Sequence, residues 1–144
     1  EDAITFCNGS LSIAKKLLSN SNFKNNVDLV LDILLNYRKS TQTILYSSRL
    51  YDNKDDFIDI LNIYLKLLQD SNYLRLGLKD LLFNDRYITS LNRIAREFSV
   101  DAIYHLVERA LLLKEKIDRN CNYQSLIDSF LLGILEVRHF CPIK

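Results

Sequence analysis

Glycine and proline are scarce in this chain, which has 3 Gly and 1 Pro among its 144 residues. In average proteins the two residue types together make up about 12%. A β-rich fold needs turn residues about every 8–12 positions, and collagen-like or linker-rich chains need still more glycine and proline. Hydrophobic residues make up 48% of the sequence, which disordered chains do not have. The composition therefore favours a compact helical fold.

Apolar residues recur with a helical period from Phe23 almost to the end of the chain. We predict an all-α bundle of about six or seven helices. The wide apolar face after Phe57 predicts that this helix lies at the centre of the bundle. The expected helical stretches are 23–37, 44–51, 57–73 with an extension toward Gly77, 87–98, 101–117 and 126–135.

Polar residues at the expected helix starts predict where two of these helices are capped. Asn53, followed by Asp55 and Asp56, is predicted to cap the helix that carries Phe57, because carboxylates near an N-terminus interact favourably with the helix dipole. Ser99 is predicted to cap the helix that follows it.

The charges of the chain are balanced, with 19 Lys+Arg against 18 Asp+Glu and a net charge of +1. A free-standing nucleic-acid-binding protein usually has a basic stripe and a high pI, so the composition argues against that class. No apolar run approaches the roughly 18 residues of a membrane span. Cys7, Cys121 and Cys141 are odd in number and far apart, which is typical of reduced thiols in a cytoplasmic protein.

The sequence offers little catalytic or ligand-binding chemistry. Gly9, Gly77 and Gly133 stand alone, so no glycine-rich phosphate loop is predicted. His105 and His139 lie far apart, and neither has a histidine partner one helical turn away, as zinc motifs of the HExxH type require. We therefore expect no catalytic, cofactor-binding or metal site and no small-molecule ligand.

Basic residues gather on one expected helix. Arg86, Arg93 and Arg96 could share a face and contact phosphate groups. Cations near helix C-termini are also favourable on an ordinary solvated face, and acidic neighbours such as Glu97 weaken any positive field. We favour the solvated face.

Several expected helices have wider apolar faces than one small core needs, and surplus apolar surface is typical of interfaces. The residues thus indicate a helical module that binds other proteins. One alternative is a helical ligand-binding or dimerisation domain of a transcription regulator, which would form a stable homodimer. Another is a small helical enzyme, which would need several perturbed carboxylates in one cleft.

Short motifs near the end of the chain carry a resemblance to a known family. Asn120-Cys121-Asn122, Ile127-Asp128 and Phe130-Leu131-Leu132 look like the segment that opens the final helix in the C-terminal part of the delta-prime subunit of the bacterial DNA polymerase III clamp loader. Leu82-Phe83-Asn84-Asp85 resembles the family's apolar-Asn-x-Asp turn, although Asn and Asp are adjacent here. Gln69-Asp70 departs from the Arg-Asp that is common in the family.

The start of the chain resembles a different part of the same proteins. Gly9 to Ala14 is similar to the Gly-Ser-x-x-x-Ala helix that closes the lid of clamp-loader ATPase modules. Ser12 stands where the hydrolysing subunits usually have a nucleotide-sensing arginine, and a serine cannot stabilise phosphate charge as a guanidinium does. This departure favours the non-hydrolysing delta-prime subunit, while the clamp-opening delta subunit is harder to exclude.

The resemblance implies a division of the chain and a function. Residues 1–22 would be the end of the ATPase-module lid, and residues 23–144 would be the helical collar that assembles the loader. Because the chain begins with Glu1 rather than Met, we expect it to be a piece of a longer protein. Its partners would be the other clamp-loader subunits, it would contact DNA only indirectly through the complex, and it would bind no membrane and catalyse no reaction.

Six residues are candidates for subunit contact or helix capping on the strength of these motifs. For the asparagines and the aspartate near helix starts, we favour capping and dipole interactions over direct subunit contact. The candidates are Asn84, Asp85, Asn120, Asn122, Asp128 and Leu131.

Overall fold

The computed structural model describes residues 23–79, 87–117 and 122–140. Within these ranges the chain forms six α-helices and no strand, which confirms the predicted all-α bundle of about six or seven helices. The helices are α3 (Phe23–Asn36), α4 (Thr43–Asp52), α5 (Phe57–Arg75), α6 (Ile88–Glu97), α7 (Val100–Ile117) and α8 (Tyr123–Phe140). The expected lid segment, residues 1–22, lies outside the described residues.

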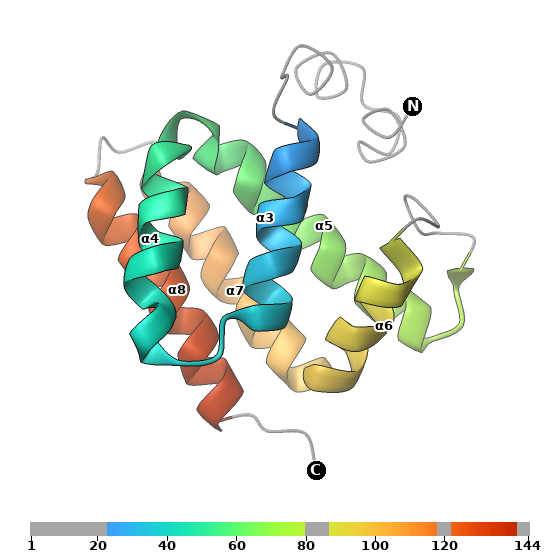
Figure 1. Cartoon of the computed structure of the whole chain (residues 1–144). Helices are drawn as coiled ribbons and strands as arrows, with labels where there is room; N and C mark the ends of the chain where they lie inside the picture. Colours follow the sequence, from blue (N-terminus) through green and yellow to red (C-terminus); the bar gives the residue numbers. More distant parts are fainter. Residues whose placement is uncertain (1–22, 80–86, 118–121, 141–144) are drawn as a thin grey trace.

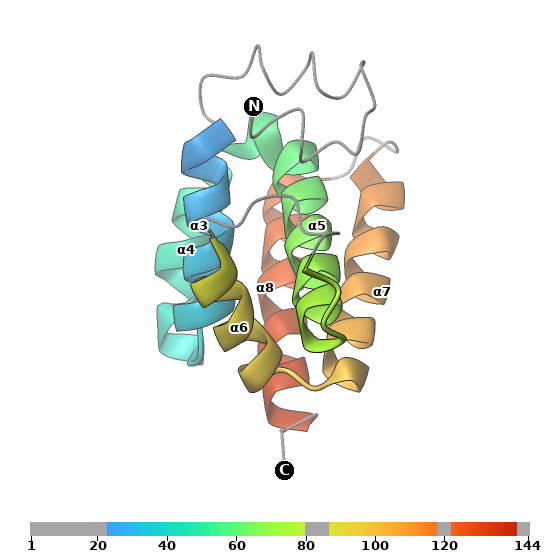
Figure 2. The ribbon, with the colours of Figure 1, turned by 90° about the vertical axis from the view of Figure 1, so that its right-hand side faces the viewer.

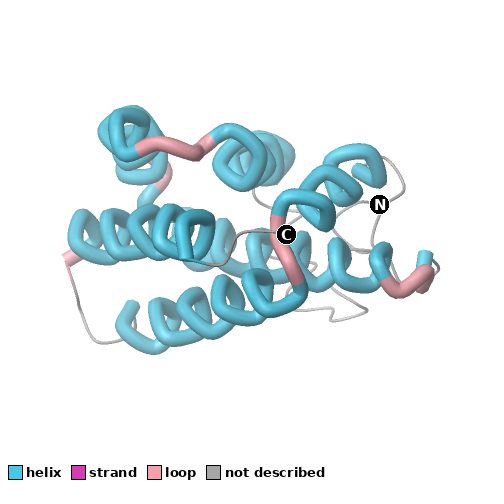
Figure 3. Tube along the Cα trace, turned by 90° about the horizontal axis from the view of Figure 1, so that it is seen from below, coloured by secondary structure: helices cyan, strands magenta, loops and turns pink. Residues whose placement is uncertain are grey.

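The helices pack along one another (Figures 1 and 3). Helix α5 contacts α3, α6 and α7, while α8 contacts both α4 and α7. Figure 2 shows α8 behind α5, with α4 toward one side of the bundle and α7 toward the other. Helix α8 therefore lies between α4 on one flank and α7 on the other.

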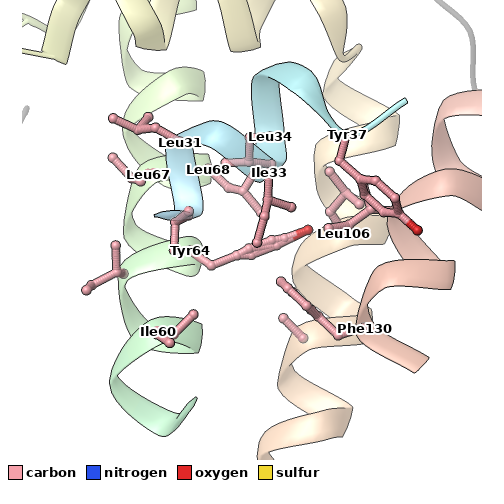
Figure 4. Close-up of a cluster of buried hydrophobic side chains, with 14 of the residues drawn as sticks. Leu31, Ile33, Leu34, Tyr37, Ile60, Tyr64, Leu67, Leu68, Leu106 and Phe130 are labelled. Carbon is pink, nitrogen blue, oxygen red and sulfur yellow. The ribbon is translucent and has the colours of Figure 1, made fainter. Parts of the chain in front are cut away.

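Helix α5 is the centre of the core, as its wide apolar face predicts. Its Tyr64 side chain is completely buried and lies between Ile33 of α3 and Phe130 of α8 (Figure 4). The rings of Tyr64 and Phe130 meet edge to face with centroids 4.9 Å apart, a favourable aromatic geometry. Burial raises the pKa of the Tyr64 hydroxyl far above its usual range. The Tyr64 side chain of α5 thus joins α3 and α8 in the core.

One of the two predicted caps is correct and the other is wrong. Ser99 caps α7, because its Oγ accepts a hydrogen bond of 3.0 Å from the backbone N–H of Ala102. Asn53 does not cap α5: its side chain donates backward to the carbonyl of Arg49 at 2.8 Å and so closes the end of α4. A short 3₁₀ turn, Lys54–Asp56, comes between Asn53 and α5.

Helix α5 ends at a glycine with a left-handed backbone. Gly77 has φ +78°, its N–H bonds to the carbonyl of Leu74, and the N–H of Leu78 bonds to the carbonyl of Tyr73. This pair of hydrogen bonds is a Schellman motif, which favours glycine at the left-handed position. Helix α5 therefore ends at Arg75, and Gly77 supplies the left-handed residue that terminates it.

A polar group fixes α4 against α3. Arg49 contacts Asp32 through Nη1 and Oδ2 at 2.5 Å, and Tyr46 and Asn36 also donate hydrogen bonds to Asp32. Partial burial opposes ionisation of this carboxyl, but the hydrogen bonds from Asn36 and Arg49, the charge of Arg49 and the Tyr46 hydroxyl together lower the pKa of Asp32. The ionised form of Asp32 therefore stabilises the folded state.

This lowered pKa predicts a loss of stability in acid. Stabilisation by Asp32 is fully present above its unfolded pKa of about 3.9 and is lost as the pH falls through the lower folded pKa. Asp32→Asn should therefore lower the free energy of unfolding at pH 7 and weaken its decrease below about pH 4, measured by urea unfolding across pH. Asp28→Asn, at an exposed position on the same helix, is the control. An unchanged pH dependence in Asp32→Asn would contradict this role.

Candidate subunit interface

Three of the six candidates can be located in the structure. Asn84, Asp85 and Asn120 lie outside the described residues. Asn122 directly precedes α8, Asp128 is in its second turn, and Leu131 follows three residues later. The structure separates these three side chains by what each of them contacts.

Asn122 satisfies the backbone of its own helix. Its Oδ1 accepts hydrogen bonds from the N–H groups of Gln124 at 2.9 Å and Ser125 at 3.4 Å. These are donors that an α-helix leaves unpaired at its N-terminus, so Asn122 has the geometry of an N-cap.

Asp128 belongs to a polar network between α4 and α8. Its Oδ1 accepts hydrogen bonds from Ser47 Oγ at 3.1 Å and from Gln124 Nε2 at 3.0 Å. Gln124 Nε2 also donates to Ser47 Oγ at 2.8 Å. The sequence analysis missed this network, because Ser47 and Asp128 are 81 residues apart. The sequence does contain one sign of this network: Ser47 is a polar residue one turn before Leu50, on the apolar side of α4.

Leu131 lies in the interior of the bundle. Its side chain is 0% exposed and belongs to the continuous apolar core. Because neighbouring subunits cannot reach a fully buried side chain, Leu131 stabilises the domain itself rather than a subunit contact.

A groove with exposed apolar walls runs between α4 and α8, above the Asp128 network. We call it the α4–α8 groove; its volume is about 590 Å³. Ile44 is 83% exposed and Leu132 is 50% exposed, so large apolar groups face solvent on both walls. The lining residues are Thr43, Ile44, Ser47, Ser48, Tyr51, Asp52, Gln124, Asp128 and Leu132.

A second exposed apolar surface lies on α7, on the other flank of α8. Tyr104 and Leu111 are exposed and seven residues apart, which places them on one side of the helix. We call this pair the α7 ridge. Between them the exposed residues His105 and Glu108 are polar. Apolar anchors surrounded by polar groups are the usual composition of a protein–protein interface.

Two other kinds of site, a metal-binding cluster and a membrane-spanning helix, are absent from the part of the chain that the structure describes. Among residues 23–79, 87–117 and 122–140, no group of three or more His, Cys, Asp or Glu side chains could hold a metal ion. No helix in the same ranges has the length and apolar character to cross a membrane. The α4–α8 groove and the α7 ridge are both suited to other protein surfaces.

Comparison with known proteins gives the family. Residues 21–135 match the family described as DNA polymerase III, delta subunit, C terminal, and the chain belongs to this family. No curated protein and no solved structure matches the chain. The family is that of a clamp-loader subunit of DNA polymerase III, a non-catalytic component in DNA replication, and the helical bundle fits a role in clamp-loader assembly. Nothing in the match supports the transcription-regulator alternative.

Proposed function

We propose that this chain is the collar region of a delta-prime-type clamp-loader subunit. Residues 1–22 form the end of the ATPase-module lid, and residues 23–144 form the domain that joins neighbouring subunits. Ser12, in place of a nucleotide-sensing arginine, supports delta-prime over a hydrolysing subunit. The chain acts in the cytoplasm, catalyses no reaction and needs no cofactor, and its assembly role requires no direct contact with DNA.

The observation that carries this proposal is the presence of two different exposed apolar surfaces on the two flanks of α8. A subunit inside a ring needs two unlike surfaces, because each of its neighbours meets a different side of it. The α4–α8 groove is concave and contains Asp52 and Asp128, whereas the α7 ridge presents Tyr104 and Leu111 on a single helix. Each surface serves one neighbour.

The chemistry of the groove indicates what fills it. Ile44 and Leu132 need apolar contacts, and the two lining carboxylates, Asp52 and Asp128, need a cation once water is excluded. A helix of the adjacent subunit that combines apolar residues with a lysine or arginine meets both needs.

Light-scattering chromatography tests the proposal. The chain is measured alone and after mixing with the clamp-loader ATPase subunit from the same source. A monomer or weak oligomer that shifts into a defined heteromeric complex is the expected result. A tight homodimer that ignores the ATPase subunit would contradict the collar role. A parent protein that opens the sliding clamp by itself would identify the delta subunit instead.

A double substitution tests the groove within that complex. Ile44→Glu with Leu132→Glu places two carboxylates beside Asp52 and Asp128 and removes both apolar anchors. Binding to a neighbouring subunit should weaken on the order of a hundredfold, measured by titration calorimetry, while the thermal unfolding curve stays close to that of the wild type because both residues are exposed. Leu45→Glu is the matched control, since Leu45 is exposed on the same helix but does not line the groove. Equal loss in both variants would contradict the assignment of the groove.

A further inference from the structure

Three arginines converge on one glutamate at the end of the bundle where α3, α6 and α8 finish. Arg38 Nη2 lies 2.5 Å from Glu97 Oε1, Arg93 Nη2 lies 3.7 Å from the same oxygen, and Arg138 Nη1 lies 3.6 Å from Oε2. We call this group the arginine cluster. Arg49–Asp32 and Arg109–Glu136, by comparison, each join one cation to one carboxylate between two helices. The arginine cluster therefore holds more positive charge than its carboxylate can neutralise.

Part of this positive charge has a structural role. The Arg138 side chain is only 10% exposed, its Nη2 donates to the carbonyl of Leu34, and its guanidinium lies 4.5 Å from the centre of the Phe98 ring. Burial and the nearby charge of Arg38 lower the pKa of Arg138. Arg138 thus binds the ends of α3, α6 and α8 together and, with Glu97, forms the floor of the cluster.

Arg38 and Arg93 are much more accessible than Arg138. Both side chains are about half exposed. The side-chain hydrogen bonds that Arg38 makes with described residues go to the Leu35 carbonyl and to Glu97, and both leave from Nη2. Because both guanidinium groups contact the same Glu97 oxygen, they lie close enough together to share one further anion.

The surroundings add to the positive charge. Lys39 and Arg96, the sequence neighbours of Arg38 and Glu97, are exposed. With Lys39 and Arg96 beside the cluster in the sequence, three arginines contact a single carboxylate, Glu97, in a chain whose total charge is +1.

We propose that Arg38 and Arg93, on the floor formed by Arg138 and Glu97, bind phosphate groups of a nucleic-acid backbone. Guanidinium groups match phosphate oxygens with paired N–H donors. The site reads no base sequence, because phosphate contacts position a nucleic acid without specifying it. Positive charge alone would suit an acidic protein as well as a nucleic acid. The choice of nucleic acid therefore rests on the proposed function in a DNA-replication assembly.

A binding titration with a labelled dT oligonucleotide of about 20 nucleotides at low salt tests the proposal. Arg38→Gln with Arg93→Gln should weaken binding about tenfold and reduce the salt dependence by about 0.7 per lost phosphate contact. Glu97→Gln should tighten binding severalfold, because it removes the competing carboxylate. Arg49→Gln, which removes an arginine of similar exposure at another place, should leave binding unchanged.

Four other results would overturn the proposal. Equal binding by the wild type and the Arg38→Gln/Arg93→Gln variant would overturn the proposal, as would weaker binding by a folded Glu97→Gln variant. Preference for polyglutamate over the oligonucleotide would identify an acidic-protein site and overturn it too. Binding of inorganic phosphate alone, without the oligonucleotide, would reject the nucleic-acid source. Since these titrations use the 144-residue chain without other subunits, they remain interpretable if assembly with the ATPase subunit fails.

Discussion

Leu131→Asp is expected to abolish the cooperative folding of this chain. The Leu131 side chain is 0% exposed and lies in the apolar core, so an aspartate there would bury a charge among apolar side chains. The penalty for such a buried ion is several kcal/mol, while a whole domain of this size is stable by only about 5–15 kcal/mol. Circular dichroism during heating should show a broad, low-temperature transition or none.

The adjacent residue provides the matched control. Leu132→Asp adds the same carboxylate one position along α8, where the side chain is half exposed and lines the α4–α8 groove. This variant should unfold near the wild-type temperature. A folded Leu131→Asp variant, or two variants that unfold alike, would contradict the assigned direction of the two side chains.

Phe130→Ala should produce the second large effect. Phe130 meets the Tyr64 ring at 4.9 Å and the Phe57 ring at 6.1 Å, and both contacts join α8 to α5. Loss of a buried phenyl group and the cavity that remains typically cost about 3–5 kcal/mol. Urea denaturation should show this loss as a lower midpoint with an unchanged slope.

Two further substitutions define the origin of that effect. Phe140→Ala removes the same group from an exposed position on the same helix and should change the stability by less than about 0.5 kcal/mol. Phe130→Leu should lie between alanine and the wild type, because it refills part of the cavity. A Phe130→Ala variant as stable as Phe140→Ala would show that the aromatic contacts do not hold α8 in place.

Local periodicity was sufficient to predict the helices but not their exposed sides. In the α4 stretch, Ile44 and Leu45 belong to the apolar pattern, yet both face solvent while Leu50 is buried. Spacing along one helix shows that apolar residues share a side; it does not show whether a second element covers it. The surplus of apolar surface was visible in the sequence, whereas its position beside α8 required the structure.

The cap signals show the same limit on a smaller scale. Ser99 caps α7, whereas Asn53 has the carbonyl of Arg49 within reach and bonds to the helix behind it. Asparagine has both donors and acceptors in its side chain, so its preference for a helix start can be reversed by the preceding helix. Sequence pattern alone cannot decide between these two bonds.

The contacts between distant parts of the chain could not be predicted from one sequence. Glu97 and Arg38 are 59 residues apart, and the Ser47–Asp128 bond spans 81 residues. Nothing in the spacing of either pair shows that their helix ends meet. The arginines of α6 were recognised as a possible phosphate surface, but Arg38 and Arg138, which complete the cluster, were not.

The bond from Arg138 to the Leu34 carbonyl, 104 residues earlier, has a consequence for how the protein is made. Helix α4 leaves the ribosome long before α8, yet its packing is complete only when α8 reaches it. A nascent chain that has not yet produced α8 exposes the apolar side of α4 and has only one wall of the α4–α8 groove. Such a chain lacks the complete groove that we propose as a subunit contact, so we expect it to assemble only after α8 has folded against α4.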